Sequence, residues 1–229
     1  MKKLSMILLV FLSLGSLAAV AQKKEERSLG SFTEIKVSEA IDVYLKKGDK
    51  EKAVVETSRV EVHKVLTEVS GGRLKVHMAS GRYGNRGPVK VYITFVNLES
   101  ISVSSAANVF SESVIKANRL EIQASSAGSA ELEIDADEAY ASASSSGDME
   151  LEGKTNSLKV SVNSAGSVDA YDLEAKVVRA RANSAGSAKV SASDEIDAHA
   201  SSGGSIKYRG NPSRSRTDSS SGGSVRKSN

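Results

Sequence analysis

Apolar and polar residues alternate along much of the chain, which is typical of β-strands that bury one face. Clear examples lie at residues 120–124, 158–162 and 188–192. The alternation is interrupted at nearly even intervals by short groups of Ser, Ala, Asn and Gly, residues that favour turns. The pattern therefore predicts many short strands joined by regularly spaced corners.

One four-residue phrase recurs at these interruptions. Its seven copies are Ser104–Ala107, Ser125–Gly128, Ser144–Gly147, Asn163–Gly166, Asn183–Gly186, Ser201–Gly204 and Ser220–Gly223, and their last residues are 21, 19, 19, 20, 18 and 19 positions apart. This period is too short for two-helix repeats, and the leucine-rich consensus is absent. We therefore predict an all-β fold, a single-stranded parallel β-helix (β-solenoid) with coils of about 19–20 residues.

The second position of the phrase is serine in every copy. These residues are Ser105, Ser126, Ser145, Ser164, Ser184, Ser202 and Ser221. In stacked coils they form a line, and we expect each hydroxyl to bond to the neighbouring coil, because Ser both donates and accepts. The Gly that ends most copies is expected to supply the positive φ of a sharp corner. A line of nucleophiles or a sugar-binding stripe is the alternative, but the chain has no G-x-S-x-G elbow.

Residues 22–103 have larger apolar side chains and a less regular period. Strands are predicted at Phe32–Val37, Ile41–Leu45, Leu74–Met78 and Val89–Phe95, and a short helix at Glu61–Val69 closed by Gly71 and Gly72. Ser38–Val43 resembles a degenerate eighth copy of the phrase. We predict residues 22–103 as an enlarged, β-rich N-terminal capping part of one domain, 104–225 as the solenoid repeats and 226–229 as a basic tail.

Residues 1–21 are predicted to be an export signal. Lys2 and Lys3 precede an apolar run, and Ala19-Val20-Ala21 provides a small-x-small cleavage site. An uncleaved N-terminal membrane anchor is the alternative, and no later stretch is apolar enough to span a bilayer. We expect an exported chain, located in the periplasm, on the outer-membrane surface or outside the cell. The absence of Cys excludes disulfides, a cysteine nucleophile and a thiolate zinc site.

Charge is nearly balanced overall but uneven along the chain. The formal net charge of +3 does not indicate nucleic-acid binding. Residues 120–153 contain nine acids and no base, whereas residues 205–229 are basic. This pattern suits head-to-tail association of copies or binding to anionic surface glycans. A charged end that stops further strand addition is the alternative that we favour. Glu131, Glu133, Glu150 and Glu152 are a candidate calcium site, because carboxylates stacked on adjacent coils attract a divalent cation. A solvated face that prevents edge pairing is the alternative, and no cofactor is predicted.

The segment Gly81–Pro88 is a candidate ligand-binding loop. It carries Arg82, Tyr83 and Arg86 among turn-forming residues. Arginine and tyrosine suit a carboxylate or a sugar ring through bidentate and stacking contacts. A plain turn between two strands is the alternative.

The chain resembles the putative auto-transporter adhesin, head GIN domain family. The resemblance rests on GSFTEIKVSEAIDVYLKKGD at Gly30–Asp49 and on the later SSAGSA units, and it spans roughly Phe32–Tyr208. It implies a right-handed parallel β-helix in the cell envelope or outside the cell. Ala40-Ile41-Asp42 stands where the family favours Gly-Ile-Asn, and no catalytic residue is carried over.

These features predict a non-catalytic, adhesin-like binding module that presents its long faces to a glycan or a cell-surface protein. The alternative is a carbohydrate-active enzyme, a polysaccharide lyase or hydrolase, on the same scaffold. A glycosidase needs two carboxyl groups at a set distance, one with its pKa raised by burial. Acids flanked by Ser and Ala on an exposed strand do not offer that contrast.

Overall fold

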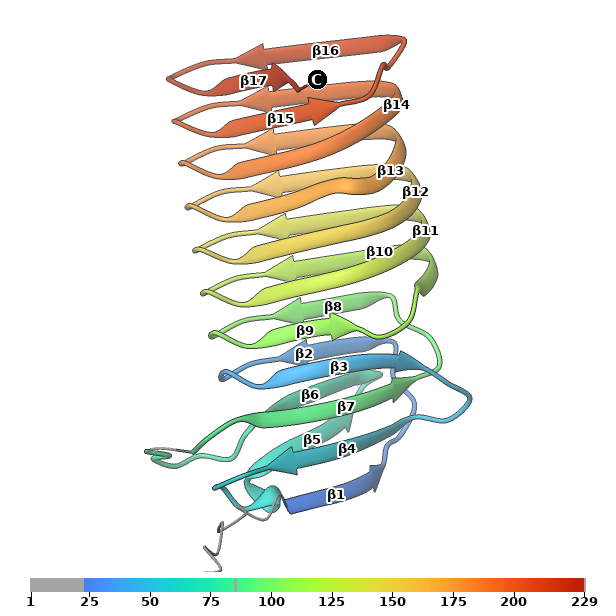
Figure 1. Cartoon of the computed structure of the whole chain (residues 1–229), viewed down its shortest axis with the longest axis vertical. Helices are drawn as coiled ribbons and strands as arrows, with labels where there is room; N and C mark the ends of the chain where they lie inside the picture. Colours follow the sequence, from blue (N-terminus) through green and yellow to red (C-terminus); the bar gives the residue numbers. More distant parts are fainter. Residues whose placement is uncertain (1–22, 85, 229) are drawn as a thin grey trace, which may run out of the picture.

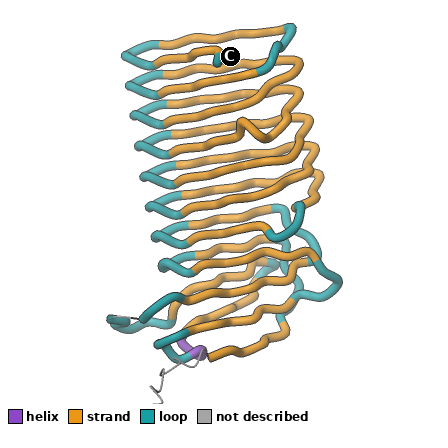
Figure 2. Tube along the Cα trace, in the orientation of Figure 1, coloured by secondary structure: helices purple, strands orange, loops and turns teal. Residues whose placement is uncertain are grey.

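The structure, a computed structural model, describes residues 23–84 and 86–228 and is all β. Its 17 strands form one sheet that winds around itself into a solenoid (Figures 1 and 2). Within these residues no helix has the length and apolar character needed to cross a membrane. The predicted export signal, residues 1–21, lies outside the described part of the chain.

Four long strands define the regular coils: β11 (Ser129–Ala143), β12 (Asp148–Val162), β13 (Ser167–Ala182) and β14 (Ser187–Ala200). Each follows one wide face, bends around a curved edge and returns along the other face to the next corner (Figure 1). We call the face formed by the residues after each corner the front face and the other the back face.

The coils stack in parallel register, which confirms the predicted β-solenoid. Ser129 pairs with Asp148, Asp148 with Ser167, Ser167 with Ser187 and Ser187 with Ser205, so one coil takes 18 to 20 residues. As the chain climbs in Figure 1 it runs to the right on the near side and to the left on the far side, so the coils are right-handed.

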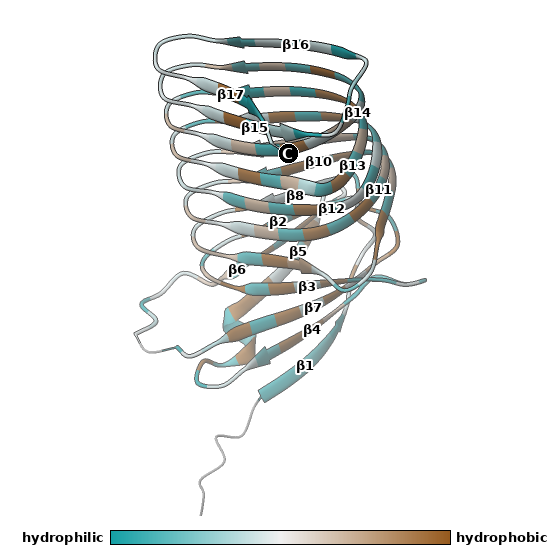
Figure 3. Ribbon diagram, turned by 45° about the horizontal axis from the view of Figure 1, so that its top comes forward, coloured by the Kyte–Doolittle hydropathy of each residue, from teal (hydrophilic) through white to brown (hydrophobic). Residues whose placement is uncertain are grey.

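The interior is thin because small side chains fill much of it. In β11 the alternate residues Ala130, Leu132 and Ile134 are buried, and Ala139 and Ala141 are buried on the returning half. Figure 3 shows this alternation as brown and teal bands along the strands. Alternation of period two thus places one side of every strand in the core and the other in solvent.

Each repeated phrase forms the same tight turn. In the third copy, Ser145 and Ser146 have φ values of 49° and 60°. The Gly147 amide donates a 2.8 Å hydrogen bond to the Ser144 carbonyl. Positive φ at both central residues is the signature of a type I′ turn, which here reverses the chain between the back and front faces.

The glycine at the end of the phrase has a different role from the one we expected. Gly147 is not among the residues with positive φ, which occupy the second and third positions. A Cβ on Gly147 would lie 2.5 Å from the Ala124 carbonyl carbon and 2.7 Å from the Ser125 nitrogen, both backbone atoms of the preceding coil. Glycine is therefore required at Gly147 because neighbouring coils approach closely. The positive-φ positions of the turn hold only non-glycine residues in five of the seven copies, whereas Gly203 and Gly222 take the third position in the last two.

The repeated serines lie in a line, but the ladder that joins them is made by backbone groups. The carbonyl of each second-position serine accepts a hydrogen bond of 2.9–3.2 Å from an amide of the preceding coil. Their hydroxyls make no hydrogen bond within the described residues, contrary to our expectation. The serines concerned are Ser105, Ser126, Ser145, Ser164, Ser184, Ser202 and Ser221.

The N-terminal strands stack in an order that differs from their order in the sequence. They are β1 (Lys23–Ser28), β2 (Glu34–Val37), β3 (Asp42–Lys47), β4 (Lys52–Thr57), β5 (Val65–Ser70), β6 (Arg73–Met78), β7 (Val89–Phe95), β8 (Ser100–Val103), β9 (Asn108–Ser111) and β10 (Ile115–Ala124). The coil β2/β3 lies between the coils β6/β7 and β8/β9, because β2 pairs with both β6 and β8 and β3 with both β7 and β9. Antiparallel strands β1, β4 and β5 close this end.

Two local predictions in this region have different outcomes. The degenerate phrase at Ser38–Val43 forms the same corner, with φ of 67° at Glu39 and 51° at Ala40. The helix predicted at Glu61–Val69 is wrong: only Val62–Lys64 form a 3-10 turn, and Val65–Val69 belong to strand β5. Gly71 and Gly72, at φ of 57° and 74°, close the β5–β6 hairpin, and pairing with β6 outweighs the helical spacing of the apolar residues.

The last coil consists of β15 (Ser205–Arg209), β16 (Arg214–Ser219) and β17 (Ser224–Lys227). β16 pairs with the returning half of β14, so Ser215, Thr217 and Ser219 continue the inward columns of Ile196, Ala198 and Ala200. All residues of β16 are exposed. Polar residues thus take the inward positions at this end of the stack.

The corner geometry predicts opposite effects for two neighbouring substitutions. Gly147→Ala should destabilise the fold by about 3 kcal/mol, because its Cβ meets backbone that cannot move aside. Ser146→Gly should be neutral or stabilising by up to about 1 kcal/mol, because it relieves a left-handed residue at some cost in chain entropy. Thermal unfolding followed by circular dichroism checks both, and equal losses in the two variants would contradict this account of the corner.

Candidate functional site

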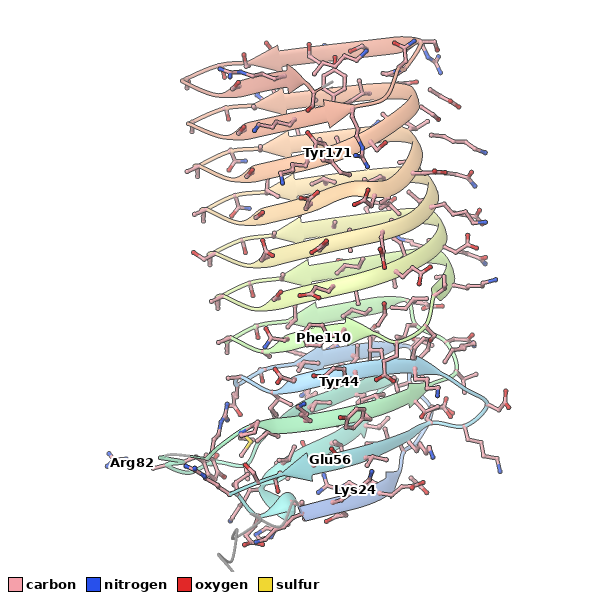
Figure 4. The ribbon with its side chains drawn as sticks, in the orientation of Figure 1. Lys24, Tyr44, Glu56, Arg82, Phe110 and Tyr171 are labelled. Carbon is pink, nitrogen blue, oxygen red and sulfur yellow. The ribbon has the colours of Figure 1, made fainter. Side chains whose placement is uncertain are left out.

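Three aromatic side chains form a row on the front face near the N-terminal end. Tyr92 on β7, Tyr44 on β3 and Phe110 on β9 are in register. The ring centroids of Tyr44 and Tyr92 are 5.0 Å apart and those of Tyr44 and Phe110 are 5.2 Å apart, with interplanar angles of 18° and 21°. Because their strand neighbours point into the core, the three rings face outward and are half-buried. We call this set the aromatic row; Figure 4 labels Tyr44 and Phe110.

The aromatic row lies between two surface depressions. The one beside Tyr92 has a volume of about 570 Å³ and is lined by Lys24, Lys46, Lys47, Lys52, Val54, Glu56, Ile93, Thr94 and Glu112 as well. The one beside Phe110 has a volume of about 220 Å³ and is lined by acidic residues described below. The Lys24 ammonium forms an ion pair with the Glu56 carboxylate, with a nitrogen–oxygen distance of 2.9 Å. This contact raises the pKa of the Lys24 ammonium above its ordinary value.

The aromatic row offers apolar and polar contacts together. Neither the Tyr44 nor the Tyr92 hydroxyl makes a hydrogen bond to another residue in the described part of the chain. The Lys90 ammonium lies 5.8 Å from the centroid of the Tyr44 ring. Rings that present an apolar body and a polar tip are favoured at binding surfaces, because they bury large area with little loss of side-chain entropy.

Our reading of the sequence missed the aromatic row. Tyr92, Tyr44 and Phe110 are brought together by the non-sequential order β7–β3–β9, which no local pattern predicts. A partial signal was present, because aligning Ser38–Val43 with Ser104–Val109 also places Tyr44 opposite Phe110. Nothing comparable in the sequence points to Tyr92.

The structure gives separate roles to the residues of the candidate loop. The loop replaces the tight corner between β6 and β7. The Arg86 guanidinium donates to the carbonyls of Glu39 and Ala40 at 2.6 and 2.9 Å, so it ties the loop to the adjacent corner. The Tyr83 hydroxyl donates to the Ala79 carbonyl at 2.6 Å, and its ring packs against the core. Of the three, only Arg82 projects away from the body (Figure 4).

The structure brings the four candidate calcium ligands together on adjacent strands. Glu131 pairs with Glu150, and Glu133 with Glu152. With Phe110, Ser111 and Leu132 they line the smaller depression, and all four are exposed. Among the described residues, no group of three or more acidic or His side chains is arranged to hold a metal ion.

A longer groove follows the curved edge of the solenoid. Two depressions of about 840 and 890 Å³ share Asp135 and Asp137. Ala136, Thr155, Ala175 and Ala192 are buried, in register, along its floor. Some of its polar side chains pair with one another: Lys154 lies 3.5 Å from Asp135, and the Asn156 amide donates to Asp137 at 2.9 Å. The described residues that line the groove include no aromatic side chain, so it lacks the ring surfaces that the aromatic row offers.

No residue of the kind that acid–base catalysis uses is buried in the described part of the chain. The buried polar residues there are Thr57 and Thr155. Asp197, on the back face, has its pKa lowered by a hydrogen bond from Arg181, which is the direction for a paired surface carboxylate. A general acid instead needs a carboxyl group whose pKa is raised by burial.

Solved structures from Bacteroides and Parabacteroides have the same fold. A putative adhesin from Bacteroides fragilis is 20% identical, with a TM-score of 0.81 over 91% of this chain and 97% of that chain. A putative adhesin from Parabacteroides distasonis is 19% identical, with a TM-score of 0.74 over 92% and 98%. A putative lipid binding protein from Parabacteroides distasonis is 22% identical, with a TM-score of 0.64 over 91% and 97%. At these identities the likeness shows a shared fold.

A comparison with curated proteins finds no match. The family model described as "Putative auto-transporter adhesin, head GIN domain" matches residues 31–212. This match includes the aromatic row and all but the last of the repeated corners. The chain therefore belongs to the putative auto-transporter adhesin, head GIN domain family.

Proposed function

We propose that this protein is an exported, non-catalytic module of the bacterial cell envelope that binds a glycan through the aromatic row. The observation that carries the proposal is the alignment of Tyr92, Tyr44 and Phe110 on one outward face at about the spacing of the strands. Sugar rings have apolar faces and polar edges, which suit aromatic rings flanked by hydroxyl, ammonium and carboxylate groups. The family name supports a role in adhesion.

The alternative, a carbohydrate-active enzyme on this scaffold, has weaker support. The acids nearest the aromatic row, including Glu131 and Glu133, are exposed. The general acid of a glycosidase instead lies in a setting partly shielded from water. The relatives of known structure named above as adhesins also favour binding over turnover.

Removing two rings of the aromatic row should weaken glycan binding. We expect Tyr44→Ala/Phe110→Ala to lower affinity for a retained polysaccharide by at least about tenfold, equivalent to about 1.4 kcal/mol. The measurement is affinity electrophoresis of the purified chain against a panel of soluble neutral and anionic polysaccharides, followed by calorimetry on any that retards it.

Tyr140→Ala is the matched control for this experiment. Tyr140 is also half-buried and lies on the returning half of β11, where its ring contacts Arg119 at 4.4 Å. This variant should bind as the parent chain does. Equal affinity in the parent and the Tyr44/Phe110 variant would show that the aromatic row is not the binding site. Binding to a protein but to no glycan would show that the partner is a protein.

Incubation of the parent chain with a polysaccharide that it retains should release no reducing ends and no unsaturated products. The physical reason is the lack of buried acid–base groups in the described residues. Product that accumulates in proportion to protein, and that disappears in Glu131→Gln/Glu150→Gln, would establish the enzyme alternative.

A further inference from the structure

One outward column of the front face changes the sign of its charge halfway along the solenoid. In order of stacking it consists of Glu131, Glu150, Asp169, Lys189, Lys207 and Arg226. Three acids on consecutive coils are thus followed by three bases on consecutive coils. We call this set the charge column; it begins where the aromatic row ends, because Glu131 pairs with Phe110.

Only the middle of the charge column is neutralised within the chain. Lys189 and Asp169 form an ion pair of 2.7 Å. The outer four residues, Glu131, Glu150, Lys207 and Arg226, are exposed, and none forms an ion pair or side-chain hydrogen bond in the part of the chain that the structure describes. Like charges on adjacent strands repel one another. At each end of the charge column, the fold itself supplies no opposite charge to offset this repulsion.

A second copy of the same face supplies these counter-charges. Reversing the charge column about its midpoint, between β13 and β14, places Glu150 opposite Lys207 and Glu131 opposite Arg226. We propose that two copies of this chain associate front face to front face and in opposite directions, about a two-fold axis that runs parallel to the strands at this midpoint. The contact is then isologous, with the same residues contributed by both copies.

The shape of the front face suits such a contact. The neighbouring outward column is formed mostly by serines, including Ser167, Ser187 and Ser205, so it presents little relief. Sheets pack about 10 Å apart, a distance that Glu and Arg or Lys side chains can bridge from opposite sides. Tyr171 lies near the midpoint, with the Arg209 guanidinium carbon 4.8 Å from its ring centroid (Figure 4), and tyrosine is enriched in interface centres.

The size of the face predicts a weak dimer. Six strands spaced about 4.8 Å apart and front segments about 20 Å long give roughly 600 Å² per copy, below the roughly 800 Å² of a standard interface. Exposed ion pairs contribute about 0–1 kcal/mol each and are screened by salt. We therefore expect a concentration-dependent dimer that dissociates as ionic strength rises.

This arrangement leaves the aromatic row of each copy uncovered. Arg226, in the last strand, lies opposite Glu131 of the second copy, so Phe110, Tyr44 and Tyr92 extend beyond the contact. The dimer would present two aromatic rows at opposite ends. Its existence does not depend on the proposed glycan, so self-association and glycan binding can fail separately.

Charge-reversal variants of a chain that starts at Gln22 test the proposal. Sedimentation velocity in about 20 mM salt should show a monomer–dimer equilibrium that shifts to monomer in about 0.5 M salt. Lys207→Glu/Arg226→Glu should weaken dimerisation at least about tenfold, and so should Glu131→Lys/Glu150→Lys, because each pairs like charges across the axis. Mixing these two variants should restore a dimer, since every contact between them is again between opposite charges.

The matched control is Lys159→Glu/Arg179→Glu. These two bases are also exposed and in register on adjacent coils, but they lie on the back face. This variant has the same change in net charge and should dimerise like the parent. A parent chain that stays monomeric at low salt and high concentration, a dimer that survives in Lys207→Glu/Arg226→Glu, or two variants that fail to associate when mixed would each overturn the proposal.

Discussion

The close approach of one corner to the next is the constraint on which the rest of the structure depends. Corner amides reach the carbonyls of the neighbouring coil at 2.9–3.2 Å, and in the six copies that end in glycine the space between the two backbones excludes a Cβ at that position. This contact aligns every coil with the one before it. Residues at equivalent positions then form straight columns, and the surface chemistry of the protein is organised by column.

Columns explain why short-range sequence features are poor guides to this surface. The aromatic row combines residues 92, 44 and 110, and the charge column combines single residues from six strands. Neither set is a motif along the chain. Each becomes a continuous stripe only because the register brings one residue per coil into line.

Much of the fold could be predicted from the sequence, because each coil of the solenoid is built from residues that are close together in the chain. The even spacing of the phrases and the alternation around them indicate coil length, corners and buried faces. The role of Gly147 was misjudged, because a requirement for close approach and a requirement for positive φ select the same residue. The stacking order of the N-terminal strands could not be predicted, because the pairing of β2 and β3 involves segments that are distant in sequence. The hydrogen bonds of Arg86 could not be predicted for a related reason: its acceptors, the carbonyls of Glu39 and Ala40, belong to a corner far away in sequence.

The insertion of β2/β3 between later strands also affects how the molecule assembles and comes apart. An ordinary stack of repeats can add coils one after another as the chain emerges, and it can fray from either end. Here residues 34–47 have both neighbours in place only after residues 100–111 have been synthesised, so the first coil must wait for long-range closure. Once that coil is paired, it has a hydrogen-bonded neighbour on both sides. Unfolding under force or heat should therefore begin at the last coil and proceed toward the N-terminal end.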